Sequence, residues 1–535
     1  MMKTLLSYQS KTLTGAALLL ALASLVSRLV GVARDRILAH QFGAGIELDI
    51  YTAAFRIPDF IYNLLIVGAL SAGFIPLFLG LYQKGKKGAW MFASRVINTT
   101  LICVSFVSLI LYFFTPELVQ FLVPGFSEEA TLSTIELTRI MLLSPILLGL
   151  SAVVSGVLQS LKAFFIYSLA PVLYNLGIIA GALFLVPMFG LKGLAYGVVL
   201  GAFFHLIIQI PVLLTSGFRY SKSISFTDPS IKKLTSALVP RTFTLASVQI
   251  TTLVLTFFAS FLGTGSLAIF NFASNISSLP IGIIGISFAV AAFPTLSEFV
   301  ANKDMEGFKK QLALTTRQIL FFILPLTILF ILLRAQIVRV LLGSGKFNWE
   351  DTIMTATTVG MFSISLFSQC LLALYSRAFF ALHNGRTPLY IAIISMLTTV
   401  FLSFTLKEYF GVPGLALGIS IGSILQVALL WAGLKKILGR EEEGNILKSI
   451  AKISLACIGL GLVTQLLKYP LAQIVNMDTF MGIFLQGLLA GLGGLVVYIL
   501  VAWLLRVQEL TLLGRSLHRK WLKLRNIPPE TDGLK

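Results

Sequence analysis

The stretch TGAALLLALASLVSRLVGVARDRILAHQFGAG, residues 14–45, decides the fold class, because four charged residues follow an apolar run within one predicted span, 14–38. Apolar runs of about 18 or more residues are candidate membrane-spanning helices. A charge at the membrane centre costs roughly 2.5–3.5 kcal/mol on insertion scales, so charges that persist there usually face a water-filled cavity. The stretch therefore predicts a membrane helix with a polar, functional face.

The whole chain has the composition of a membrane protein. It has 535 residues, of which 57% are hydrophobic and only 12% are charged, whereas soluble proteins carry about 25% charged residues. The net charge of +19 comes from lysines and arginines that are concentrated in short segments between apolar runs and in the tail. Neither zinc-finger spacing nor an RNA-binding motif accompanies them. The basic excess therefore indicates membrane topology and attraction to anionic lipids, and no nucleic-acid partner is expected.

The apolar runs predict an all-α polytopic membrane protein with about fourteen transmembrane helices. The expected spans are 14–38, 49–82, 90–114, 132–160, 164–188, 193–215, 231–262, 266–300, 312–333, 352–381, 388–407, 412–434, 446–467 and 480–505. Lysine- and arginine-rich connections alternate with acidic or neutral ones. The positive-inside rule places the basic connections in the cytoplasm, which predicts that both termini are cytoplasmic.

A short pair of similar sequence motifs, the sequence echo, occurs once in each half of the chain. Phe42-Gly43-Ala44-Gly45 is followed in the next predicted span by Ala72-Gly73-Phe74-Ile75-Pro76. Leu262-Gly263-Thr264-Gly265 is followed at almost the same interval by Ala291-Ala292-Phe293-Pro294. Parallel repeats are a transporter architecture in which the substrate site lies between the lobes. The predicted parts are a six-helix lobe at 1–222, a second six-helix lobe at 223–440, two further spans in 441–505, and a basic cytoplasmic tail at 506–535.

Polar stripes run through the first two predicted spans. Residues seven apart lie within about 20° of each other on a helix, so Arg28 and Asp35 share one face of the first span. In the second span Asp49, Arg56 and Asn63 have the same spacing. Guanidinium groups bind phosphate oxygens through paired hydrogen bonds, which makes a phosphate or diphosphate the expected ligand of these arginines.

The polar neighbours of these arginines are candidates for supporting or gating roles. Asp59 lies one helical turn from Arg56, and Asp35 and Asp49 could hold the arginines while the site is empty. Charges near helix ends also commonly extend to the membrane surface. A purely structural role therefore remains open for Arg36 and Asp49.

No motif in the sequence indicates an enzyme. The chain lacks a P-loop, an HExxH helix and a GxSxG nucleophile elbow. Its three cysteines and four histidines are dispersed without metal-ligand spacing. We therefore expect a transporter without a metal or cofactor, and the long apolar faces beside the polar stripes suggest a substrate with a charged head and a lipid tail.

Several motifs carry a family resemblance. The stretches SRLVGVARDRILAHQFGAGIELDIYTAAFRIPDF (27–60) and GALSAGFIPLF (68–78) resemble the N-terminal signature of the MurJ (MviN) family of lipid II flippases. LLGSGKFNWEDTIMTA (341–356) and YSRAFFALHNGRTPLYIAI (375–393) are similar in style and position. The resemblance places the chain in the multidrug/oligosaccharidyl-lipid/polysaccharide exporter superfamily.

The resemblance implies a V-shaped, alternating-access bundle of two six-helix lobes plus two C-terminal helices, in the bacterial cytoplasmic membrane. Its substrate would be an undecaprenyl-diphosphate-linked muropeptide, and the cell-wall synthesis machinery is left open as a partner. By position Arg28, Arg34, Asp35, Asp49 and Arg56 match charged cavity residues of the family. Arg34 lies about 120° round an ideal helix from Arg28, so a bend at Gly31 would be needed to bring both into one cavity.

The chain departs from the family pattern in its second span and throughout its second half. Family members often carry charged residues at the positions of Tyr62, Val67, Ser274, Asn275 and Ser278. The acidic residues of the sodium site described in some members are also missing from the seventh and eleventh spans. Two alternatives therefore remain: a flippase for another polyprenyl-linked oligosaccharide, such as a teichoic, capsular or O-antigen precursor, and a membrane scaffold that transports nothing.

Overall fold

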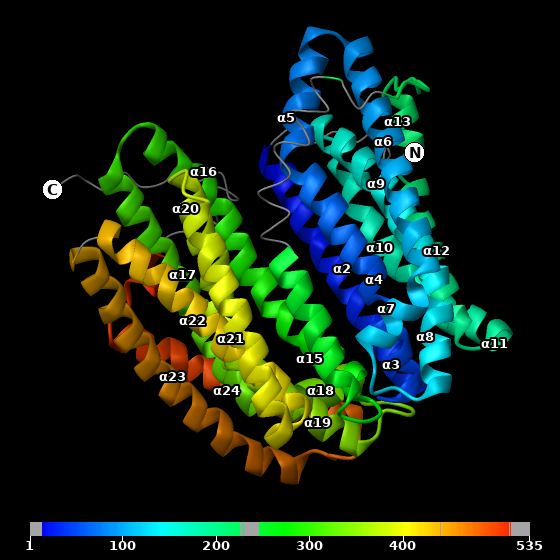
Figure 1. The fold of residues 1–535 in the computed structure, drawn as a ribbon. Coiled ribbons are helices and arrows are strands. Elements are labelled where there is room, and N and C mark those ends of the chain that lie inside the picture. Colours follow the sequence, from blue (N-terminus) through cyan, green and yellow to red (C-terminus); the bar gives the residue numbers. More distant parts are fainter. Residues whose placement is uncertain (1–12, 225–227, 229–245, 439, 513, 515–535) are drawn as a thin grey trace. The chain divides into compact units, whose positions relative to one another are not determined.

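The computed structural model describes residues 13–224, 228, 246–438, 440–512 and 514, and these residues form helices and no strand (Figure 1). The predicted basic tail at 506–535 lies largely outside the described residues. The helices of the first half are α2 (Leu13–Phe42), α3 (Ile46–Ala54), α4 (Arg56–Ile61), the π-helix η1 (Tyr62–Val67), α5 (Gly68–Lys84), α6 (Lys86–Phe113), α7 (Thr115–Leu122), α8 (Glu128–Met141), α9 (Leu143–Ser160), α10 (Phe164–Ala180), the π-helix η2 (Gly181–Leu185), α11 (Val186–Phe189), α12 (Lys192–Ile207) and α13 (Ile210–Thr215). Those of the second half are Ala246–Ser260, α15 (Ser266–Pro280), the π-helix η3 (Ile281–Ile286), α16 (Ser287–Ala301), α17 (Met305–Leu332), α18 (Arg334–Leu342), α19 (Trp349–Ser363), α20 (Leu366–Ala381), α21 (Arg386–Phe410), α22 (Val412–Leu438), α23 (Arg440–Ile474) and α24 (Phe480–Leu504).

The all-α, multi-pass prediction is confirmed. Among the described residues ten helices are long and apolar enough to cross a membrane, and the pair α19 and α20, bent by 44°, would make an eleventh. The predicted count of fourteen spans is not established by these helices and stays a prediction. Most of the predicted span 231–262 lies outside the described residues.

The second predicted span, 49–82, is broken into α3, α4, η1 and α5. The first break falls at Phe55. Pro58 has no backbone N–H to donate to the carbonyl of Ala54, four residues before it, and its ring would clash with that carbonyl in a regular helix.

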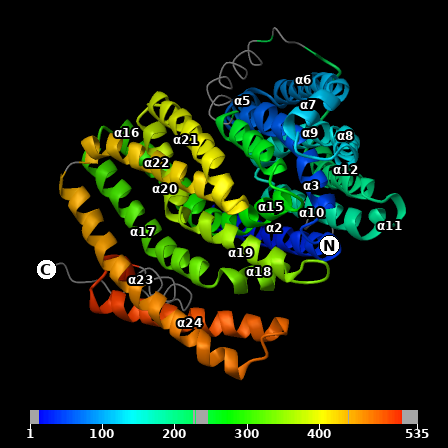
Figure 2. The ribbon, with the colours of Figure 1, turned by 60° about the horizontal axis from the view of Figure 1, so that its bottom comes forward.

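The described chain forms two compact units. Unit 1 comprises Met1–Phe272, Leu341–Asp351 and Ser403–Leu415. Unit 2 comprises Ala273–Val340, Thr352–Leu402 and Ala416–Lys535. Within unit 2, α23 and α24 run side by side, and α23 also packs against α17 (Figure 2).

The helix boundaries repeat along the chain at a constant offset. The helices α6 and α17 have equal lengths, beginning at 86 and 305 and ending at 113 and 332. The π-helices η1 and η3 are separated by the same offset, from 62 to 281 and from 67 to 286. The starts of α7 and α18, at 115 and 334, also share it. The short Gly- and Ala-rich echo in the sequence therefore marks a repeat of secondary structure.

Each copy of the repeat also contains a polar seam between two helices. In unit 1 Ser151 contacts His205 and Ser155 donates to Gln209, and both pairs are 54 residues apart. In unit 2 Ser420 donates to Ser365 and Ser368 contacts Ser423, both 55 residues apart. Hydroxyl and amide groups that bond across helices hold membrane bundles together where the hydrophobic effect cannot.

Several helices are followed by a residue in the left-handed conformation. The second residue after α9, α16, α20 and α24 has positive φ without being glycine; these residues are Lys162, Lys303, His383 and Arg506. The ends of α2, α11, Ala246–Ser260 and α21 use glycine instead, at Gly43, Gly190, Gly263 and Gly411.

Candidate functional site

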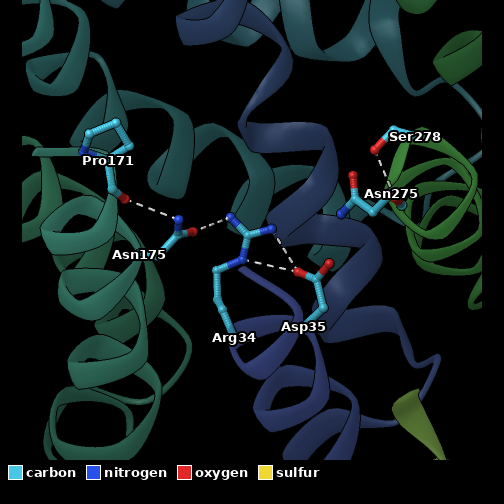
Figure 3. Close-up of polar contacts among 6 residues, drawn as sticks. All are labelled: Arg34, Asp35, Pro171, Asn175, Asn275 and Ser278. Carbon is cyan, nitrogen blue, oxygen red and sulfur yellow. Dashed lines mark hydrogen bonds and ion pairs between the residues drawn. The ribbon is translucent and has the colours of Figure 1, made fainter. Parts of the chain in front are cut away.

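Arg34 is held between two helices of unit 1 (Figure 3). Its Nε and Nη2 donate to Oδ1 of Asp35 at 3.0 and 2.7 Å, and its Nη1 donates to Oδ1 of Asn175 on α10 at 3.0 Å. Asn175 in turn donates to the carbonyl of Pro171 at 3.1 Å, which orients its oxygen toward the guanidinium. Arg34 therefore has a fixed direction, and two of its five N–H donors are not used in these bonds.

Arg56 is the second arginine of the constellation. Its Nε donates to the hydroxyl of Thr256, on the helix Ala246–Ser260, at 2.9 Å. Asp59 interacts electrostatically with both Arg56 and Arg34. Among the described residues Asp59 forms no direct ion pair with either arginine, so its charge acts on both at longer range.

Asn63 supports the backbone beside Asp59. Its Nδ2 donates to the carbonyl of Asp59 at 2.9 Å, at the start of η1. A π-helix changes the pattern of backbone hydrogen bonds, and the amide of Asn63 supplies an additional donor where that change begins. Its role in the structure is to hold the chain at Asp59.

Three tyrosines interact with the charged residues; sequence reasoning missed Tyr51 and Tyr174 and noted Tyr62 only as a departure from the family pattern. Tyr51 interacts electrostatically with Arg34, Asp35 and Asp59, and Tyr174 interacts with Asp59, Arg34 and Tyr51. Tyr62 also interacts with Asp59. Their phenol groups add hydrogen-bonding capacity to the constellation without adding charge at neutral pH.

Asp49 lies at a helix N-terminus and is almost fully buried, with 1% of its surface exposed. Its Oδ2 accepts a hydrogen bond from the amide of Gly265 at 2.6 Å, and its Oδ1 accepts one from the amide of Ala268 at 2.8 Å. These amides are at the start of α15, where backbone donors lack helical partners and the helix dipole attracts a negative charge. Asp49 joins the turn after α2 to the turn before α15, which are the two copies of the sequence echo.

Arg28 does not join the contacts of Arg34. The helix α2 is continuous from Leu13 to Phe42, without a break at Gly31, so six residues still separate the two side chains by about 120°. Arg28 is half-buried, and among the described residues its side chain has no hydrogen bond or ion pair. The ion pair expected between Arg28 and Asp35 is thus replaced by a pair between Arg34 and Asp35.

The charge balance determines what the constellation can bind. Arg34 and Arg56 are matched by Asp35 and Asp59, so the four groups together are neutral, as low-dielectric surroundings require of an empty site. Arg28 adds one uncompensated positive charge on the same helix as Arg34. An anion with several oxygens could accept hydrogen bonds from the two unused N–H donors of Arg34. It could also replace the carboxylate of Asp35 as the partner of that guanidinium. Among the described residues there is no cluster of three or more His, Cys, Asp or Glu that could hold a metal ion.

The structure brings some predicted residues together and separates others. Arg34, Asp35, Arg56 and Asp59 form one constellation with Asn63 beside them, whereas Asp49 caps α15 and Arg28 lies on another face of α2. Asn175 and Thr256 were missed because they lie 141 and 200 residues from the arginines they contact. Neither is charged or part of a periodic pattern.

Comparison with known proteins identifies the family. Residues 38–485 match the family model described as lipid II flippase MurJ. A probable lipid II flippase MurJ of Buchnera aphidicola (Schizaphis graminum) is 29% identical over 76% of this chain and 80% of its own. The lipid II flippase MurJ of Burkholderia cenocepacia is 26% identical over 77% of this chain and 82% of its own.

Solved structures agree with that match. A lipid II flippase MurJ in an inward closed conformation superimposes with a TM-score of 0.75 at 26% identity, covering 91% of this chain and 98% of that one. An inward-facing multidrug resistance transporter of the MATE family shares the fold, with a TM-score of 0.66 at 18% identity over 79% of this chain and 95% of that one. The chain therefore belongs to the lipid II flippase MurJ family.

Proposed function

We propose that this protein moves lipid II, an undecaprenyl-diphosphate-linked muropeptide, from the inner to the outer leaflet of the bacterial cytoplasmic membrane. The observation that carries the proposal is the Arg34 guanidinium, held between Asp35 and Asn175 with free donors, in a chain of the MurJ family. The protein acts as a transporter and catalyses no bond change.

The diphosphate is the part of the substrate that the arginines recognise. Arg34 and Arg56 bind its oxygens through paired, charge-assisted hydrogen bonds, and Arg28 supplies the positive charge that the neutral constellation lacks. Asp35 and Asp59 hold the arginines in position while the substrate is absent. Binding therefore exchanges carboxylate oxygens for phosphate oxygens and leaves no arginine unpaired.

Transport requires the site to face the two sides of the membrane in turn. The lobes are 1–222 and 223–440, which correspond to the two copies of the repeat, and 441–505 adds two helices. Asp49 and the amides of Gly265 and Ala268 connect the first-repeat and second-repeat turns on the external side. Breaking this connection is the expected first step toward an outward-open state.

The membrane potential is sufficient to drive the movement. With both termini in the cytoplasm, outward transport carries the negative diphosphate away from the negative side. For each negative charge that crosses, the free energy falls by about 2.3 kcal/mol per 100 mV of membrane potential. No sodium site is needed in this scheme, and the cell-wall synthesis machinery that consumes lipid II outside is the expected functional partner.

Complementation tests the proposal. In cells depleted of their own lipid II flippase, the wild-type chain should restore growth, and Arg34→Ala, Arg56→Ala and Arg28→Ala should not. Lys84→Ala, at an exposed position at the end of α5, is the control and should restore growth. Growth of the arginine variants at normal expression would show that these residues do not carry the function.

A second candidate cargo follows from the neutral residues of α15. By the family resemblance charges would be expected at Ser274, Asn275 and Ser278. Here these residues are neutral, and the hydroxyl of Ser278 donates to the carbonyl of Asn275 at 2.7 Å (Figure 3). Another polyprenyl-linked oligosaccharide could require fewer charges. Native mass spectrometry with mixed lipids distinguishes the two, because a lipid II flippase should retain lipid II preferentially.

A further inference from the structure

A basic cavity of about 110 Å³ lies in unit 2, where α17, α23 and the turn after α24 meet. Its volume is several times the roughly 10–15 Å³ that one water molecule requires. Four cationic residues line it: Arg317, Lys448, Lys452 and Arg506. One carboxylate, that of Glu509, is among the lining groups. Cations therefore outnumber carboxylates four to one in the lining of this cavity.

The single carboxylate compensates one of the cations. Oε1 of Glu509 lies 3.3 Å from Nε of Arg317, and Glu509 is only 4% exposed. Nη1 of Arg317 also donates to Oε1 of Gln508 at 3.0 Å. Within the described part of the chain the ammonium of Lys452 reaches no carboxylate; its acceptor is the carbonyl of Arg506 at 3.5 Å. Lys448, Lys452 and Arg506 thus leave a net positive charge around the cavity.

A buried hydroxyl provides an independent sign of a missing ligand. Ser449 lines the same cavity and is 7% exposed, yet its Oγ has no hydrogen-bond partner among the described residues. Nε of Arg317 and Oε1 of Glu509, although paired in charge, also lack an aligned hydrogen bond there. Buried polar groups in native proteins are nearly always hydrogen-bonded. The Oγ of Ser449 is itself buried, so it would gain its partner by rotating toward a ligand bound in the cavity.

We propose that this cavity binds a phosphate group. Ser449 donates a hydrogen bond to a phosphate oxygen, and Lys448, Lys452 and Arg506 neutralise its charge. The phosphate belongs either to the headgroup of an anionic phospholipid or to a free phosphate ion, since both offer the same oxygens. Basic pockets between membrane helices on the cytoplasmic side are suited to such groups.

Binding at this site would connect three segments of the fold. Arg317 comes from α17, Lys448, Ser449 and Lys452 come from α23, and Arg506 follows α24. A phosphate bridging them stabilises the packing of the C-terminal helix pair on α17. Such a ligand favours the folded state in proportion to its occupancy.

The source of the phosphate can be determined with the full-length protein in nanodiscs. The thermal unfolding midpoint is measured in phosphatidylcholine alone, in phosphatidylcholine with phosphatidylglycerol, and in phosphatidylcholine with inorganic phosphate. A lipid site predicts a rise with phosphatidylglycerol that high salt reduces and that free phosphate does not reproduce. A free-anion site predicts a saturable rise with inorganic phosphate. No rise with either probe overturns the proposal.

Variants of the lining residues show whether the cavity is responsible. Lys448→Gln/Lys452→Gln should weaken binding of the effective probe by roughly tenfold per cation removed, while the charge-matched control Lys84→Gln/Lys436→Gln, at two exposed positions, should retain it. Equal losses in both double variants would mean that general surface charge, not this cavity, attracts the anion.

Two single variants keep the test valid if the double variant folds poorly. Ser449→Ala removes one hydroxyl and should weaken binding without lowering the midpoint in phosphatidylcholine alone. Glu509→Gln removes the opposing charge and should tighten binding. Unchanged binding in both variants would overturn the assignment.

Discussion

The carboxylate of Asp49 receives the backbone amide of Gly265 at 2.6 Å, across 216 residues of sequence. Asp49 lies in the first turn of α3, directly after the first turn of the internal repeat, and Gly265 ends the second such turn, directly before α15. Gly265 has φ +85, and a Cβ there would lie 2.1 Å from the carbonyl oxygen of Ala44. This close contact therefore needs a residue without a side chain at 265. It also needs the carboxylate of Asp49, which accepts hydrogen bonds from the free amides at the start of α15.

Replacing Asp49 should weaken this junction. Loss of a helix N-cap costs about 0.5–2 kcal/mol, so Asp49→Ala should lower the unfolding midpoint and impair growth in complementation. Asp49→Asn retains one acceptor and should recover part of the stability. An Asp49→Ala protein with wild-type stability would contradict the capping role.

Asn175 should determine the direction of Arg34. In Asn175→Leu the guanidinium loses its α10 partner, and binding of lipid II should fall by roughly fivefold to tenfold, corresponding to about 1–1.5 kcal/mol. Asn175→Asp should bind still more weakly, because its carboxylate competes with the diphosphate for Arg34. Ser168→Ala, which loses only a bond to the carbonyl of Phe165 on the same helix α10, is the control, and an equal loss there would argue against a specific role for Asn175.

Lys303 should be replaceable by glycine with a gain in stability. It follows α16 with φ +58, and its amide and that of Asp304 donate to the carbonyls of Val300 and Phe299. A left-handed conformation costs a non-glycine residue roughly 1–2 kcal/mol, so Lys303→Gly should stabilise the protein by about 1 kcal/mol against denaturant. Lys303→Ala should give no such gain; a similar gain from alanine would assign the effect to the lost charge.

Close packing of α10 on α12 should position Asn175. At Gly181, where α10 continues into η2, a Cβ would lie 2.5 Å from the Cα of Gly197 on α12, so the helices approach with no room for a side chain. Gly181→Val should therefore lower the unfolding midpoint by several degrees and weaken substrate binding. Gly444→Ala, at a position with nothing within 4 Å of a new Cβ, should have neither effect; a tolerated Gly181→Val would contradict the packing argument.

The fold class could be predicted from the sequence because apolar length and loop charge are local signals. The repeat could also be found, since its Gly- and Ala-rich turns recur at corresponding places. The breaks in the second span could only partly be foreseen: Pro58 predicts a disruption, whereas the π-helix η1 has no comparable signal. Whether a π-helix forms at Tyr62–Val67 depends on packing against other helices, which the sequence of one span does not reveal.

In the candidate site, too, the residues could be predicted from local signals, whereas their partners could not. Arg34 and Asp35 were identified from the resemblance and the spacing, but their pairing depends on which way α2 faces α10. The heptad stripe predicted Arg28 with Asp35, while the adjacent residue Arg34 forms the ion pair at 2.7 Å. Partners such as Asn175 and Thr256 come from distant helices, so only the tertiary structure could reveal them.

Binding of lipid II to purified variants tests the central claim most directly. Native mass spectrometry or a titration in detergent would compare the wild type with Arg34→Gln and Arg56→Gln, with Lys84→Gln as the control. Each arginine variant should bind lipid II at least about tenfold more weakly, because each loses charge-assisted hydrogen bonds to the diphosphate, while the control binds normally. Wild-type affinity in folded Arg34→Gln and Arg56→Gln proteins would contradict the account.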